Sequence, residues 1–223
     1  RAKAKVCYFS RREELAEGAF VRDGQLVIRW SGQEHQLCPV KDLGIKGGHN
    51  VENALAAVAS AFLAGCEPQA MVHVLKEFRG VEHRIEYVRD VDGVAYYNDS
   101  KATNTDSAIK ALETFEHGIV LLAGGDDKLT DLTDFMQLCK KRVSDLVLLG
   151  AAAERFEQEA LKNGYPAEHI HRVGFSMEKA VEKAHALAKA PQVVLLSPAC
   201  ASFDMYDGMA QRGRDFKRLV NNL

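Results

Sequence analysis

Three short segments of this chain gather the side chains that bind charged small molecules. The first, residues 98–104, reads NDSKATN and combines a carboxylate, an ammonium group and hydroxyls. Asp99 is suited to accept hydrogen bonds from ribose hydroxyls and Lys101 to meet a phosphate, and free backbone amides at the start of a following helix attract anions. A plainer interpretation is a capping turn, in which Asp99 or Thr103 satisfies backbone donors. The composition of the segment leaves both interpretations open.

The second segment, residues 124–128, pairs glycines with a lysine. Glycine lets a ligand approach the backbone closely, and the ammonium group of Lys128 is a point charge that could hold a carboxylate. A glycine turn with solvated charges explains the same residues. The segment is not a phosphate-binding loop of the G-x-x-x-x-G-K-[ST] type, because that spacing occurs nowhere in the chain.

The third segment, residues 197–204, offers two serine hydroxyls and several backbone amides around a proline. This combination can hydrogen-bond a small carboxylate. No histidine neighbours Ser197 or Ser202 in the sequence, which argues against a nucleophilic serine. Ser202 and Asp204 are equally well explained as helix caps. Ligand contact and capping are therefore alternatives here too.

Regular elements must position these segments, and the pattern after Arg79 alternates strand, loop and helix. Continuous apolar runs indicate strands covered on both faces, at 85–88, 94–97, 119–122, 146–149 and 193–196. Helical periodicity lies between them, at 105–115, 132–139, 152–162, 177–188 and near 213–222. This order predicts an α/β fold with a mostly parallel, doubly wound sheet. Ligands bind at the carboxyl ends of strands in such sheets, so the three segments should converge on one cleft.

The first part of the chain follows a different pattern. Short β-like runs occupy 6–37, with a hairpin turn at 22–25, and helical patterns follow at 50–65 and 67–78. These pieces are not expected to make a complete layered domain by themselves. At 223 residues the chain has room for two units, and we expect the boundary near 78–80.

Two further positions in or beside the first unit could reach a ligand. Asn53 follows the segment 47–50 at the start of an expected helix, and Arg84 directly precedes the first strand of the second unit. We expect Arg84 to reach a cleft between the units. The plainer interpretations are a helix cap at Asn50 and a surface arginine. Five histidines without metal-ligand spacing are interpreted as structural or solvated: His73, His117, His169, His171 and His185.

Composition limits the ligands and the setting. A formal net charge of -2 with interspersed signs provides no basic face for a phosphate backbone, which argues against nucleic acid as a partner. The 5 cysteines lack C-x-x-C spacing and are interpreted as buried thiols in a reducing cytoplasm. No apolar run approaches the roughly 20 residues that span a bilayer, so we expect no membrane segment.

Taken together, the motifs resemble those of the Mur ligases. They are GHNxxNA from Gly48, HRxE from His83, NDSKATN from Asn98, GGxxK from Gly124 and LSPAxASxD from Leu196. The NDSKATN version of the third motif is particular to the family members that add D-glutamate. The resemblance runs from about Gly47 to the last residue, and residues 1–46 are compatible with it but poor in motifs.

This resemblance implies a domain organisation. The family has a UDP-binding domain, a central ATPase domain with a P-loop, and a Rossmann-like carboxyl-terminal domain that brings the incoming amino acid. Residues 1–78 would be the carboxyl-terminal part of the central ATPase domain, without its P-loop half. Residues 79–223 would be the Rossmann-like carboxyl-terminal domain, which binds the amino acid. The chain alone is then expected to be inactive, and the whole enzyme to be a cytoplasmic monomer.

The resemblance also implies a reaction, in which an ATP-dependent ligase adds D-glutamate to UDP-N-acetylmuramoyl-L-alanine through an acyl phosphate during peptidoglycan precursor synthesis. ATP, Mg²⁺ and these two substrates are the implied ligands, with the metal ligands mostly outside the part of the family that this chain matches. The implied nucleotide-binding positions are Asn53, Arg84 and Asp99. The implied catalytic position, near the reacting phosphate, is Lys101. The implied D-glutamate-binding positions are Thr103, Lys128, Ser202 and the amide of Phe203.

Two other interpretations stay open. The chain could come from a relative that adds a different amino acid, such as the alanine-, diaminopimelate- or folate-glutamate-adding ligases. It could also be a non-catalytic Rossmann-like module that binds a nucleotide or another protein. That last interpretation explains the α/β alternation equally well, but it does not explain why polar loops recur after three strands.

Overall fold

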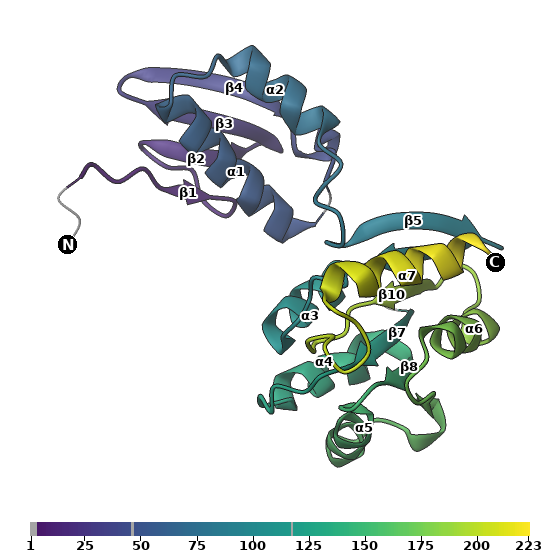
Figure 1. The fold of residues 1–223 in the computed structure, drawn as a ribbon. Coiled ribbons are helices and arrows are strands. Elements are labelled where there is room, and N and C mark those ends of the chain that lie inside the picture. The colour runs from purple at the N-terminus through teal and green to yellow at the C-terminus, as the bar shows by residue number, and fades with distance from the viewer. Residues whose placement is uncertain (1–3, 46, 117) are drawn as a thin grey trace. The chain divides into compact units, whose positions relative to one another are not determined.

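The computed structural model describes residues 4–45, 47–116 and 118–223 of the chain. The chain divides into two compact units, Arg1–Gly80 and Val81–Leu223, and each is described by itself (Figure 1). No helix among the described residues is long and apolar enough to cross a membrane.

The first unit is built on a four-stranded sheet in the order β1-β2-β3-β4. The strands are β1 (Phe9–Ser10), β2 (Gly18–Arg22), β3 (Gln25–Trp30) and β4 (Gln33–Pro39). The pair β1 and β2 is parallel and the others are antiparallel. Asp23 and Gly24 join β2 to β3 with φ angles of 50° and 72°, as a tight hairpin turn requires. The hairpin predicted from the sequence is therefore present.

Two helices complete this unit, α1 (Gly48–Leu63) and α2 (Pro68–Glu77), after a short 3₁₀ turn at Val40–Asp42. Pro68 occupies the first turn of α2, where its missing N–H costs no hydrogen bond. Buried side chains of β2, β3, α1 and α2 form one core, which includes Ile28, Leu55 and Met71. The helices and the sheet therefore pack as two layers around one core, and the expectation that they do not make a complete domain by themselves stays a prediction.

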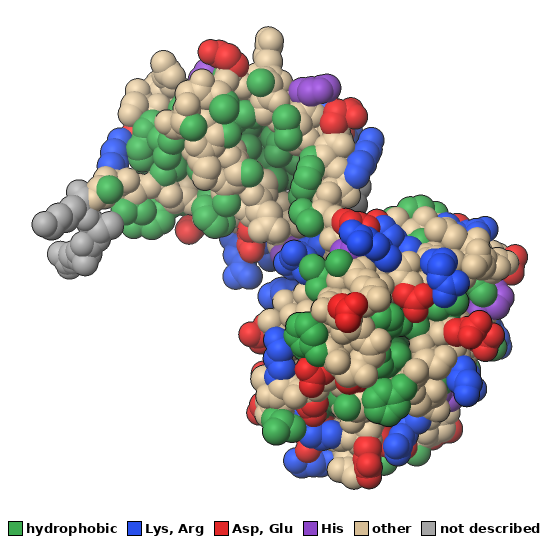
Figure 2. Space-filling view, in the orientation of Figure 1, with side chains coloured by type: hydrophobic (Ala, Val, Ile, Leu, Met, Phe, Trp, Pro, Cys, Tyr) green, Lys and Arg blue, Asp and Glu red, His purple; other side chains and the backbone are tan. Residues whose placement is uncertain are grey.

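An apolar groove remains open between α1 and α2. Its lining comes from both helices and the connection between them, and includes Ala57, Ala61, Cys66, Met71, Val74 and Leu75. Val74 is 60% exposed, and Figure 2 shows hydrophobic side chains gathered over this part of the unit. Cys66 is exposed, so the interpretation of all the cysteines as buried thiols was wrong for this residue. The groove is an uncovered apolar surface of the kind that packs against another segment.

The second unit contains a six-stranded sheet in the order β5-β6-β10-β7-β8-β9. The strands are β5 (Glu86–Val91), β6 (Val94–Asn98), β7 (Ile119–Gly124), β8 (Val143–Leu149), β9 (Ile170–Arg172) and β10 (Val193–Leu196). Only β5 runs antiparallel to its neighbour, β6. The remaining pairs are parallel. This arrangement confirms the mostly parallel sheet predicted from the alternation of strands and helices.

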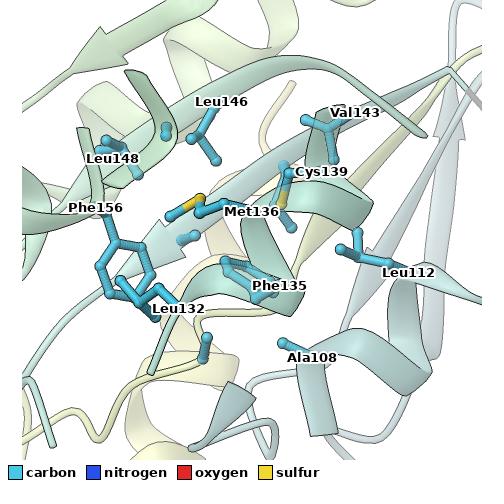
Figure 3. Close-up of a cluster of buried hydrophobic side chains, with 14 of the residues drawn as sticks. Ala108, Leu112, Leu132, Phe135, Met136, Cys139, Val143, Leu146, Leu148 and Phe156 are labelled. Carbon is cyan, nitrogen blue, oxygen red and sulfur yellow. The ribbon is translucent and has the colours of Figure 1, made fainter. Parts of the chain in front are cut away.

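Helices cover both faces of this sheet (Figure 1). They are α3 (Thr105–Leu112), α4 (Thr133–Arg142), α5 (Ala153–Lys162), α6 (Met177–Leu187) and α7 (Met209–Asn221). Side chains of α3, α4 and α5 pack into one core cluster, and those of α6 and α7 pack into another. In the first cluster the rings of Phe135 and Phe156 lie 6.1 Å apart, with Met136 beside them (Figure 3). The sheet is therefore doubly wound, as predicted.

Candidate functional site

The three polar loops follow three strands that are neighbours in the sheet, namely β6, β10 and β7. Backbone hydrogen bonds join them at the carboxyl edge. The N–H of Asp99 donates to the Leu196 carbonyl at 2.7 Å. The N–H of Gly124 donates to the Pro198 carbonyl at 2.9 Å, and Asp126 and Ala201 exchange a pair of bonds at 3.0 and 3.1 Å. The loops are thus one connected structure, at the edge where doubly wound sheets bind ligands.

Buried polar side chains gather at this edge. Among the described residues, the buried polar or charged ones are His83, Asn98, Asp99, Ser100, Ser197, Ser202 and Arg212. Burying a polar group costs free energy unless it is hydrogen-bonded. A protein core built for stability alone would spread such groups or omit them, so their concentration at one place indicates a site.

Arg212 ties two of the loops together, although sequence reasoning did not select it. Its Nε donates to the Ser100 hydroxyl at 3.0 Å, and its Nη1 donates to the Ala201 carbonyl at 2.9 Å. Its Nη2 donates to the carbonyls of Ser100 and Cys200 at 2.9 and 3.1 Å. Burial lowers the pKa of Arg212 to about 10, which leaves the guanidinium charged at neutral pH. The sequence did contain one sign that Arg212 is buried. Arg212 lies four positions before Phe216, which places both residues on the same face of α7.

Asp99 is a second buried charged residue at this edge of the sheet. Its carboxylate accepts hydrogen bonds from the Ile85 N–H at 3.2 Å and from the Ser197 hydroxyl at 2.8 Å. Burial raises the pKa of Asp99 to about 6, against the smaller lowering effects of those two bonds and of the Arg84 charge. Asp99 does not cap a helix. Asn104 caps α3, accepting from the Ser107 N–H at 2.9 Å. Neither Asp99 nor Thr103 caps that helix, but Asp99 does satisfy a backbone donor, the Ile85 N–H.

The raised pKa predicts how stability depends on pH at this position. Below pH 3.8, the ordinary pKa of Asp, the Asp99 carboxyl is neutral in both the folded and the unfolded chain, so its burial costs no free energy of ionisation. The folded chain loses stability as the pH rises through about 6. Asn has the same shape; its Oδ1 can accept from the Ile85 N–H, and its Nδ2 can donate to the Ser197 hydroxyl oxygen, which reverses that bond. Asp99→Asn should therefore stabilise the chain by about 1–3 kcal/mol near pH 7.5 and change little near pH 4. Thermal melts at the two pH values measure this, and an equal shift at both would contradict it.

Lys101 and Thr103 lie on the same loop as Asp99. The side chain of Lys101 is exposed and that of Thr103 is partly buried. The Lys101 N–H donates to the His83 carbonyl at 3.0 Å, which attaches the loop to the segment that carries Arg84. Arg84 is exposed, and His83 and Ile85 on either side of it have φ angles of 70° and 44°. Such left-handed conformations are uncommon outside glycine and fix the local path of the chain.

Lys128 and Phe203 point to solvent from the other two loops, whereas Ser202 is buried. The Phe203 side chain is 71% exposed. The part of Phe203 that the resemblance implies for ligand binding is its backbone amide, not its ring. Asp204 accepts a hydrogen bond from the Ala151 N–H at 2.9 Å, and α7 begins after Gly208. The expected helix-cap role of Asp204 was therefore wrong.

Asn53 belongs to the first unit, on α1, where its Nδ2 donates to the Asn50 Oδ1 at 3.1 Å. The N-cap position of α1 is held by Gly47, with no side-chain cap. The interpretation of Asn50 as a helix cap was wrong. The structure brings Asp99, Lys101, Thr103, Lys128 and Ser202 onto the connected loops of the second unit, and Asn53 is not among them.

The described histidines do not form a metal site. His169 and His171 both lie about 3 Å from the Asp145 carboxylate, with distances of 3.0 and 3.1 Å. His185 lies 3.1 Å from the Tyr96 hydroxyl. Within the described ranges no group of three or more His, Cys, Asp or Glu residues could hold a metal ion, and His117 lies outside those ranges.

The chemistry available at this edge is the binding of charged ligands. Lys101 and Lys128 are exposed cations on two of the connected loops, and the buried hydroxyl groups lie on the loops after β6 and β10. Cations of this kind attract phosphates and carboxylates, and the buried carboxyl of Asp99 can accept from ligand hydroxyls.

Comparisons with known proteins agree with this arrangement. A family model described as Mur ligase, glutamate ligase domain, matches residues 83–200, more than half of the chain. The UDP-N-acetylmuramoylalanine--D-glutamate ligase of Caldanaerobacter subterraneus subsp. tengcongensis is 46% identical over 223 residues, which is 100% of this chain and 48% of that protein. The ligase of the same name from Geotalea daltonii is 45% identical over 221 residues, 99% of this chain and 48% of that protein.

A solved structure shares the fold. The crystal structure II of MurF from Acinetobacter baumannii aligns with a TM-score of 0.63 and 19% identity, over 94% of this chain and 46% of that one. The chain spans about half the length of the curated relatives it matches. Because the family model matches more than half of the chain, including the first two loops and the third as far as Cys200, the chain belongs to the Mur ligase family.

Proposed function

We propose that this chain is the carboxyl-terminal half of an ATP-dependent ligase that joins D-glutamate to UDP-N-acetylmuramoyl-L-alanine. The observation that carries the proposal is the connected set of three loops, with the buried polar side chains of the described residues gathered among them. The names of the relatives at 45–46% identity support the choice of amino acid. The substrates point to peptidoglycan precursor synthesis in the cytoplasm, where the unpaired thiols suit a reducing setting.

The proposed reaction has two steps. The carboxylate of UDP-N-acetylmuramoyl-L-alanine attacks the terminal phosphorus of ATP, ADP departs, and an acyl phosphate forms, which turns a poor leaving group into a good one. The amine of D-glutamate then attacks the acyl carbon, and phosphate departs. Positive groups stabilise the charge that develops on the phosphoryl oxygens. Lys101, exposed at the edge beside Asp99, is the residue of this chain that we assign to that task.

Binding roles follow the chemistry of each side chain. We assign Asp99 and Arg84 to the nucleotide, because a buried carboxyl can accept from ribose hydroxyls and a guanidinium can stack on a base or meet phosphates. Asn53 of the first unit is also assigned to nucleotide binding. The two carboxylates of D-glutamate are assigned to Lys128, with hydrogen bonds from Thr103, Ser202 and the Phe203 amide.

The first unit fits the role of a partial ATPase domain. Its apolar groove between α1 and α2 is an uncovered surface, and the curated relatives are about twice as long as this chain. We propose that residues 1–78 complete a central domain whose P-loop half lies in the rest of the protein. In this proposal that half also supplies most of the Mg²⁺ ligands.

An amino-acid panel tests the proposal. The full-length protein is mixed with ATP, Mg²⁺ and UDP-N-acetylmuramoyl-L-alanine, and phosphate release is measured with D-glutamate, L-alanine, meso-diaminopimelate or L-glutamate. Release should depend on D-glutamate. Dependence on a different amino acid would assign the chain to another branch of the family, and nucleotide binding without any release would favour a non-catalytic module.

A further inference from the structure

Arg155 holds the turn that carries Lys128, although the two residues belong to different elements. From α5, its Nε donates to the Asp127 Oδ2 at 2.6 Å and its Nη2 donates to the Asp127 Oδ1 at 3.0 Å. The same Nη2 donates to the Thr130 carbonyl at 3.0 Å. One guanidinium therefore grips the chain on both sides of Lys128. A two-pronged arginine–carboxylate pair fixes geometry better than a single ion pair does.

The turn itself is tightly formed. The Asp127 Oδ1 also accepts from the Leu129 N–H at 2.8 Å, and Leu129 has a φ angle of 55°. A leucine in this left-handed conformation is uncommon and needs support from its surroundings. The Asp127 carboxylate supplies that support directly, and Arg155 keeps the carboxylate in place.

Helix α5, which carries Arg155, is held in place by its own packing and hydrogen bonds. Phe156, the residue after Arg155, is fully buried and packs against Phe135 of α4. The Ala152 N–H just before the helix donates to the Gly125 carbonyl at 2.9 Å, so α5 is attached to the start of the same loop. Motion of the Lys128 turn is thus restrained at its beginning, its middle and its end.

The pairing of Asp127 with Arg155 also sets the net charge beside Lys128. Asp127 is adjacent to Lys128, so an unpaired carboxylate there would repel an anionic ligand that the lysine attracts. Burial tends to raise the pKa of Asp127, but the Arg155 contacts and the Leu129 N–H outweigh it and lower the pKa, which keeps the group ionised. Arg155 supplies the positive charge that cancels it at short range.

We infer that Arg155 is a positioning residue of the amino-acid site, which orients Lys128 towards the substrate carboxylate and neutralises the neighbouring Asp127. This inference rests on the proposed function, because it concerns the same substrate. The amino-acid site then depends on a pair, Asp127 and Arg155, that does not itself contact the substrate.

Steady-state kinetics of the full-length enzyme test the inference. Arg155→Met should raise the KM for D-glutamate about tenfold while the KM for ATP stays unchanged. Adding Asp127→Asn to that variant should lower the KM again by about threefold, because it removes the carboxylate left unpaired. Arg155→Lys keeps the charge but loses the two-pronged grip, and its KM should lie between those of the wild type and Arg155→Met. A purely structural role would lower the amount of folded, active enzyme and leave both KM values unchanged.

A matched control is an arginine of β9 that pairs with a residue of the same helix. Arg172 pairs with Glu157 of α5 at 3.1 Å and is 49% exposed, so Arg172→Met should leave both KM values unchanged. The inference is overturned if Arg155→Met and Arg155→Lys keep the wild-type KM for D-glutamate, or if the double variant is no better than Arg155→Met. Lys128→Ala, assayed alongside, separates failure of the proposed function from failure of the inference about Arg155. An unchanged KM in that variant removes the proposed pocket and this inference with it, whereas a raised KM leaves the pocket standing whatever Arg155 does.

Discussion

Replacing Arg212 with methionine should destabilise this chain by about 3–5 kcal/mol, a large part of the 5–15 kcal/mol typical of a folded protein. Methionine fills a similar space but donates no hydrogen bond. The carbonyls of Ser100, Cys200 and Ala201 would lose a charged donor inside the protein. Each buried acceptor left unpaired costs about 1–3 kcal/mol. The two loops that Arg212 joins should also separate.

Urea unfolding followed by circular dichroism measures this effect. Arg214→Met is the control, because Arg214 lies on the same helix with a side chain that is 68% exposed. Its substitution should cost about 0.5 kcal/mol or less. A similar small cost for Arg212→Met would show that the guanidinium is not what joins the loops.

Lys128→Ala in the full-length enzyme should raise the KM for D-glutamate by about 30-fold to 100-fold, with the KM for ATP unchanged. The expected size corresponds to the loss of one charge-assisted hydrogen bond to a carboxylate, about 2–3 kcal/mol. The fold should not suffer, because the Lys128 side chain is exposed and its hydrogen-bonded neighbours are untouched.

A control lysine and two kinetic constants make the Lys128 result interpretable. Lys162 is 72% exposed on α5, and Lys162→Ala should behave as the wild type does. A rise in the KM for ATP of the same size as that for D-glutamate would move Lys128 out of the amino-acid pocket. An unchanged KM for D-glutamate would do the same.

Strands of the second unit could be located from the sequence because they are buried on both faces. The runs at Ile119–Gly124 and Val193–Leu196 contain almost nothing but aliphatic residues, and their predicted ends differ from the observed ones by at most two residues. Strand β9, by contrast, reads Ile-His-Arg and β4 is mostly polar, so neither has the pattern of a buried strand. Both lie at sheet edges, where fewer side chains are covered.

The edge that holds the candidate site also followed from the sequence, since polar loops after parallel strands share one edge of the sheet. What the sequence could not supply was the partner of each polar group. Asp99 was expected to satisfy backbone donors in a turn or to meet a ligand, and its further bond from Ser197, 98 residues away, depends on the folded structure. Arg155 and Arg212 were not selected, because their roles depend on contacts made only after folding.

The most direct test is a crystal structure of the full-length protein with D-glutamate and a non-hydrolysable ATP analogue. The account predicts that the carboxylates of D-glutamate contact the Lys128 ammonium group, Thr103 and Ser202, and that Asp127 and Arg155 remain paired behind them. Density for D-glutamate away from the loops after β6, β7 and β10 would contradict it.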